Sequence, residues 1–68
     1  MTNIYQKFGE RVRELRKDRG LSQEQLAEKM KMKEVRTIVA IETGKRNPTL
    51  KTINKIAKAV EIEISELF

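Results

Sequence analysis

The chain has 68 residues and a net charge of +5, and it contains neither cysteine nor histidine. A chain of this length makes a single domain, residues 1–68, with a small core. It has no thiolate, no imidazole base, and no glutamates at metal-ligand or paired-carboxylate spacing, so we expect no enzyme, no metal site and no small-molecule cofactor. No apolar run approaches the length of a membrane span and no signal-peptide pattern is present, so we expect a cytoplasmic protein without membrane contacts.

The first predicted element is a helix over residues 4–18. Its apolar residues recur at helical spacing on one stripe, opposite a charged face. Thr2 or Asn3 can cap the first turn, and Gly20 can end the helix in the left-handed conformation. The apolar stripe consists of Ile4, Phe8, Val12 and Leu15.

The second predicted helix has the clearest start in the chain. Ser22 and Gln25 have the spacing of a capping box, in which each side chain bonds to the backbone of the other residue. This helix runs to about Met30. Residues 31–33, Lys-Met-Lys, then form a tight connection in which Met32 serves as an apolar plug.

Three further helices are predicted towards the end of the chain. One covers about 34–43 and ends at Gly44, and the next covers about 50–59 after a cap at Thr49. The apolar residues of the last segment alternate as in a strand, but a short helix over 64–67 fits the helical surroundings better. We therefore predict an all-α, compact bundle of five helices.

Several segments follow one another in an order and at spacings typical of one family. They are Glu14-Leu15-Arg16, Gly20 to Ala27, Ile41 to Pro48, Ile56 to Ala59, and Ser65 to Phe68. On these residues the chain resembles the lambda-repressor/Cro-like (Xre-type) helix-turn-helix family, and in layout it is similar to the controller proteins of restriction–modification systems. The resemblance implies a helix-turn-helix over about 22–43 in a transcription regulator that binds double-stranded DNA as a homodimer, with the third helix in the major groove.

Phosphate contacts are expected at helix starts and in one basic loop. Free amides and the positive dipole end at a helix start favour an anion, and the resemblance implies that Gln23 and the loop 45–47 face the DNA backbone. The same residues are also consistent with a polar first-turn side chain and a solvated turn. The predicted phosphate-binding residues are Ser22, Gln23, Lys45, Arg46, Asn47 and Thr49.

Arg16 and Glu42 have a different predicted role. The resemblance implies that they form a salt bridge between the first helix and the end of the third. Loss of one partner would leave a partly buried charge alone, so we expect Arg16→Ala to reduce stability and not to change sequence preference.

The third helix departs from the family pattern. One more residue than usual separates Ala27 from Ile41, so either the turn is longer or the helix begins earlier. Arg36 is the one strong base-reading side chain, with the geometry to contact guanine, whereas the valines and Ala40 suit thymine methyl groups. The predicted base-reading residues are Val35, Arg36, Thr37, Val39, Ala40 and Thr43.

Val35 and Val39 leave two alternatives open. They pack inside the protein if the helix is rotated, or they face outward. An outward apolar face is also consistent with a protein-interaction module of the antitoxin or anti-repressor type. A designed or altered helix-turn-helix variant is a further alternative, because the surroundings of this helix follow the family more closely than the helix does.

The end of the chain combines apolar and acidic residues. Residues 1–60 hold fifteen basic and seven acidic side chains, whereas residues 61–68 hold three glutamates and no base. The apolar residues exceed what a short tail needs, so we expect a homodimer interface, and the resemblance implies dimerisation through the fifth helix on a pseudo-palindromic site. The predicted interface residues are Ile62, Ile64, Leu67 and Phe68.

Overall fold

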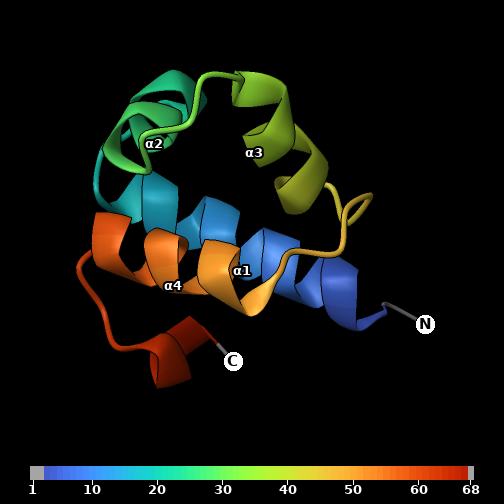
Figure 1. Ribbon diagram of the computed structural model, residues 1–68. Coiled ribbons are helices and arrows are strands. Elements are labelled where there is room, and N and C mark those ends of the chain that lie inside the picture. The colour runs from blue at the N-terminus through green and yellow to red at the C-terminus, as the bar shows by residue number, and fades with distance from the viewer. Residues whose placement is uncertain (1–2, 68) are drawn as a thin grey trace.

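The protein folds into four α-helices followed by one turn of 3₁₀-helix, as the computed structural model shows for residues 3–67 (Figure 1). The elements in chain order are α1 (Ile4–Asp18), α2 (Gln23–Lys29), α3 (Val35–Glu42), α4 (Leu50–Ala59) and η1 (Ile64–Leu67). No strand occurs within these described residues, and none of their helices is long and apolar enough to cross a membrane. The all-α prediction is therefore confirmed.

The prediction of five α-helices is wrong at its last member. Residues 64–67 form a 3₁₀ turn, in which the amide of Glu66 donates to the carbonyl of Glu63 at 3.0 Å. Four residues are too few for a ladder of α-helical hydrogen bonds, so the tighter three-residue spacing closes this turn.

Capping side chains set three of the four helix starts. Ser22 Oγ accepts from the amide of Gln25 at 3.0 Å, and the Gln25 side chain accepts from the amide of Ser22 at 2.8 Å. Asn3 makes the same kind of capping box for α1, and Thr49 caps α4. These hydrogen bonds satisfy amides that the helices themselves leave free, so the predicted starts are confirmed. Glu34, at the start of α3, makes no side-chain cap.

The turn between α2 and α3 spans residues 30–34. Lys31 adopts the left-handed conformation there, with φ of 57°, and Met32 is half-buried against the core. Because α3 begins only at Val35, the one extra residue between Ala27 and Ile41 lies in this turn and does not extend the start of the helix. The longer turn is therefore the alternative that the structure adopts.

The core lies between the helices and takes residues from all of them. In Figure 1, α2 and α3 lie on one side of α1 and α4. Packing contacts join α1 to α3, α2 to α3, and η1 to both α1 and α4. The most deeply buried side chains are Val12, Leu26, Ile38, Ile41, Ile56, Val60 and Leu67.

Leu67 corrects part of the predicted dimer interface. Its side chain is only 2% exposed because η1 folds back onto α1 and α4, so it belongs to the core of its own chain. Ile62 is half-buried against the same core, whereas Ile64 is 39% exposed. Phe68 lies outside the described residues. Of the three predicted interface residues that the structure describes, Ile64 is therefore the most exposed.

Candidate nucleic-acid interface

The outer face of α3 carries the two valines whose direction the sequence left open. Ile38 and Ile41 are each 1% exposed and face the core, whereas Val35 and Val39 are 36% and 39% exposed. The hydrophobic stripe of α3 is thus filled by the isoleucines, and the valines lie outward. The inward alternative for the valines is excluded by this orientation.

The other predicted base-reading residues differ in exposure and in whether their polar groups are already hydrogen-bonded. Arg36 is highly exposed, and its one ion pair within residues 3–67, with Glu34 at 3.3 Å, is itself exposed, so the guanidinium is available to another partner. Thr43 is exposed, but its hydroxyl donates to the carbonyl of Val39 at 2.8 Å. Thr37 and Ala40 are half-buried at the edges of the face.

A buried ion pair joins α1 to the end of α3. Arg16 Nε donates to Glu42 Oε2 at 2.7 Å, and a second guanidinium nitrogen reaches Glu42 Oε1 at 3.2 Å. The remaining nitrogen donates to the carbonyl of Leu21 at 2.7 Å, just before α2. Both side chains are almost fully buried, at 9% and 2% exposure. One arginine therefore fixes the end of α3 and the start of α2 together.

Gln23 joins this network, which the sequence did not predict. Its side-chain amide donates to Glu42 Oε1 at 3.1 Å and is partly buried. The partner is 19 residues away along the chain, so no local spacing signals the contact. The bond holds the start of α2 beside the end of α3.

Gly9 is a second residue that the sequence analysis missed. It is buried where α1 crosses the end of α3, and a Cβ atom there would meet the carbonyl oxygen of Ile41 and lie 2.7 Å from that of Glu42. Glycine is the residue that permits such a close approach of two backbones. A glycine inside a strongly periodic helix was the available signal.

The basic loop follows directly on α3. Gly44, with φ of 74°, ends the helix, and the amide of Lys45 bonds back to the carbonyl of Ala40 at 2.9 Å. Lys45, Arg46 and Asn47 are exposed, and neither basic side chain forms an ion pair with another residue of 3–67. Among residues 3–67 the loop therefore presents two cations without an ion-pair partner, three and four positions after Glu42, whose carboxylate bonds to Gln23 at the start of α2.

The serine and threonine in the predicted phosphate set are engaged as caps. The Ser22 hydroxyl accepts from Gln25, and Thr49 Oγ1 accepts from the amide of Thr52 at 3.2 Å. Both residues are exposed.

Within residues 3–67 there is also no group of three or more acidic side chains placed to hold a metal ion.

Comparison with known proteins gives consistent results. A family model described as helix-turn-helix matches residues 12–67. The chain is 43% identical to an uncharacterised HTH-type transcriptional regulator of Archaeoglobus fulgidus, over 85% of this chain and 81% of that protein. It is 40% identical to the immunity repressor protein of Bacillus phage phi105, over 87% of this chain and 40% of the repressor.

A solved structure matches the fold closely. The crystal structure of the restriction–modification controller protein C.AhdI from Aeromonas hydrophila superposes with a TM-score of 0.90 and 45% sequence identity. The match covers 94% of this chain and 96% of the controller protein. At this level of identity and coverage the two chains share one fold.

Proposed function

The chain belongs to the helix-turn-helix family of DNA-binding transcription regulators, and from this we propose that it binds a specific double-stranded DNA site as a homodimer, with α3 in the major groove. The observation that carries the proposal is the division of α3 into a buried isoleucine face and an exposed face beside an unpaired basic loop. A recognition helix needs this division, because one face must pack on the domain while the other enters the groove.

Base contacts are assigned to the exposed face of α3. Arg36 is suited to two hydrogen bonds with guanine, and Val35 and Val39 are suited to thymine methyl groups. Thr43 points outward at the end of the same helix, but its hydroxyl is bonded to α3 and contributes less. The mixed face implies a site in which G·C recognition at one position adjoins thymine-rich positions.

Phosphate contacts are assigned to the two segments that flank α3. Lys45 and Arg46 lie in the loop after the helix, and Gln23 lies at the start of α2 beside Glu42. Cations gain free energy at the DNA backbone by releasing condensed counterions, whereas polar side chains and amides fix the register. For Gln23 this contact requires its side chain to leave Glu42 or to serve both partners.

The test of sequence-specific binding is selection of bound duplexes from a random pool. We expect enrichment of a pseudo-palindrome whose half-sites lie about one helical turn apart, because a two-fold dimer presents two α3 helices. Repeating the selection with Arg36→Ala should relax the preference at one position of each half-site and leave the others unchanged. An unenriched pool, with weak salt-sensitive binding only, would contradict specific recognition.

A second candidate function has one observation in its favour. Val35 and Val39 are both exposed on the outer face of α3, so this face offers apolar surface to a protein. A protein-interaction module would use that surface and give no enriched DNA motif. The same selection therefore separates the two functions.

A further inference from the structure

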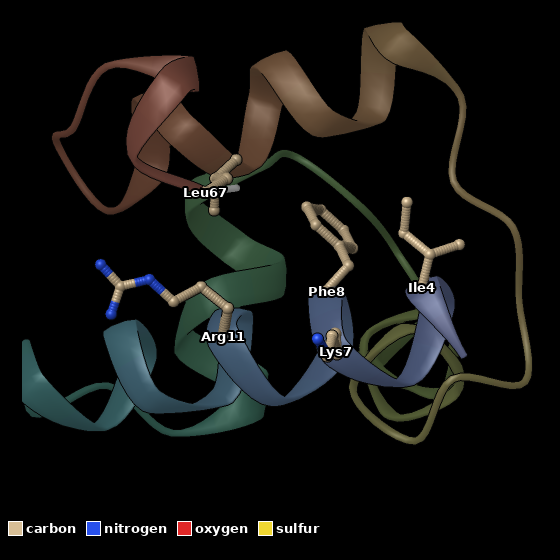
Figure 2. Close-up of a pocket in the computed structure, with 5 residues that line it drawn as sticks. All are labelled: Ile4, Lys7, Phe8, Arg11 and Leu67. Carbon is tan, nitrogen blue, oxygen red and sulfur yellow. The ribbon is translucent and has the colours of Figure 1, made fainter. Parts of the chain in front are cut away.

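Three ion pairs form within residues 3–67, and two of them are explained by the fold. The pair of Arg16 with Glu42 is buried and joins α1 to α3. Arg11 bonds to Glu14 one turn along α1. Arg11 also lines the groove between α1 and η1 that Figure 2 shows, where its Nε donates to the carbonyl of Glu66 at 3.2 Å. Both of these arginines therefore hold parts of the domain together.

The third ion pair has no such structural role. Glu34 directly precedes α3 and Arg36 lies in its first turn, with Glu34 Oε2 at 3.3 Å from Arg36 Nε. The two side chains are 64% and 85% exposed, and an exposed pair of this kind contributes little to stability. The Glu34 side chain also makes no capping hydrogen bond, although it stands at the capping position of α3. The fold therefore leaves this carboxylate unused.

The geometry of the pair leaves groups free on both side chains. The contact is made through Arg36 Nε, so the two terminal guanidinium nitrogens are open to O6 and N7 of a guanine. On Glu34 the contact is made through Oε2, and Oε1 has no hydrogen-bond partner among residues 3–67. The carboxylate thus lies at the side of the guanidinium and leaves its end to the guanine. From this position Oε1 can reach a neighbouring base pair.

We propose that Glu34 is a further specificity-determining residue, whose carboxylate accepts a hydrogen bond from the exocyclic amine of a cytosine next to the guanine that Arg36 contacts. The role assigned to Glu34 rests on the proposed placement of α3 in the major groove, where the first residues of a recognition helix meet the base edges. A carboxylate only accepts hydrogen bonds, and cytosine N4 is a donor with no acceptor beside it on the same base edge. The adenine amine lies beside the N7 acceptor, which repels a carboxylate.

The same carboxylate discriminates against other sequences. At a guanine or thymine edge it meets acceptors only, and a desolvated carboxylate without a donor costs free energy. It also repels the phosphates that every duplex carries, so it lowers affinity for DNA of unrelated sequence. Glu34 therefore raises the ratio of specific to non-specific affinity more than it raises the specific affinity itself.

The experiment compares Glu34→Gln with the unchanged protein in the selection from random duplexes. Glutamine has the same size, but its amide both donates and accepts, so the cytosine preference should disappear at one position of each half-site while the guanine assigned to Arg36 is retained. Arg36→Ala should show the converse, loss of the guanine with retention of the cytosine. In fluorescence anisotropy, Glu34→Gln should reduce the ratio of affinities for the selected site and for a duplex of unrelated sequence by at least about fivefold.

Glu63→Gln is the matched control. It removes the same charge from an exposed position near the end of the chain, and it should leave both the selected motif and the affinity ratio unchanged. Circular dichroism verifies that every variant is folded.

Two results would overturn the role of Glu34 while the assignment of α3 to the groove stands. One is that the unchanged protein and Glu34→Gln select the same motif, which means that Glu34 reads no base. The other is that Glu34→Gln loses the guanine and keeps the cytosine, which means that Glu34 acts only by orienting Arg36. A pool that the unchanged protein does not enrich would refute the placement of α3 itself, and the role of Glu34 with it.

Discussion

Arg16 makes three hydrogen bonds in the buried network, as many as Glu42 does. It satisfies both carboxylate oxygens of Glu42 and the carbonyl of Leu21. Arg16→Ala would leave a carboxylate that is 2% exposed without its cation. We expect the free energy of unfolding to drop by about 3–5 kcal/mol, measured by urea denaturation followed by circular dichroism.

Two comparison variants separate the buried pair from a simple loss of charge. Arg13→Ala removes an exposed arginine from the same helix and should change stability by less than about 0.5 kcal/mol. Arg16→Met with Glu42→Leu removes both charges and should be more stable than Arg16→Ala, because no lone charge stays buried. Equal stability of Arg16→Ala and Arg13→Ala would contradict a structural role for the pair.

Gly9 shows how close the α1 and α3 backbones lie. In an ordinary helix interior, replacing glycine by alanine raises the free energy of unfolding by about 1 kcal/mol. Here the added Cβ would lie 2.7 Å from the Glu42 carbonyl oxygen, so the helices must separate. We expect Gly9→Ala to lower the unfolding free energy by about 1–3 kcal/mol in a thermal or urea melt. Glu10→Ala, at the exposed neighbouring position, is the matched control, and a Gly9→Ala protein more stable than that control would refute the close approach.

At the scale of elements, α3 is the helix with the weakest start. Its first residue follows Glu34, whose backbone is extended with φ of −115° but whose side chain makes no cap. Glu34→Ser would supply a hydroxyl to the free amides and should raise the unfolding free energy by about 0.5–1 kcal/mol. The exposed ion pair with Arg36 that this change removes contributes little.

Glu34→Ala distinguishes capping from simple removal of the glutamate. It deletes the same carboxylate without offering a hydroxyl, so it should give no gain in the same urea titration. A gain of equal size in both variants would mean that the glutamate itself destabilises α3 and that capping is not the cause.

At the scale of the whole molecule, the proposed phosphate contacts of the basic loop predict how DNA binding depends on salt. If Lys45 and Arg46 each contact a phosphate, Lys45→Ala with Arg46→Ala should weaken binding to all sequences alike. Affinity falls as salt rises, and this fall should become shallower: the slope of log affinity against log salt should become less negative by about 2, since each lost contact removes about 0.9. Fluorescence anisotropy at several salt concentrations measures this slope.

The charge-matched control for that titration is on α4. Lys55→Ala with Lys58→Ala removes the same charge from exposed positions outside the proposed phosphate contacts. This pair should reduce affinity much less and leave the slope nearly unchanged. Equal slopes for the two double variants would show that binding depends on net charge and not on the loop.

Local signals were sufficient for most of the fold. The capping box of Ser22 and Gln25, the cap at Thr49 and the left-handed turn at Gly44 each depend on residues three or fewer positions apart, and all are present in the structure. The length of the last element was predicted less well. A four-residue segment has no helical periodicity to read, and its form depends on how Leu67 reaches the core.

The site was predictable only in part, because its key contacts join distant residues. The resemblance placed Arg16 near Glu42, but the hydrogen bond from Gln23 and the contact of Gly9 with α3 arise from how three helices cross. The direction of Val35 and Val39 was likewise undecided, since every residue from Val35 to Ile41 except Arg36 and Thr37 is apolar. A hydrophobic stripe cannot be assigned to one face when apolar residues surround the helix.

The sequence by itself determined the helices, their caps, the charge polarity and the family, because these depend on spacing, local hydrogen bonding and residue type. Only the tertiary structure decided which face of α3 is free, that Leu67 belongs to the core, and that the Gln23 side chain bonds to Glu42. These properties depend on the rotation and crossing of packed helices. Packing of the whole chain sets that geometry, and no single segment encodes it.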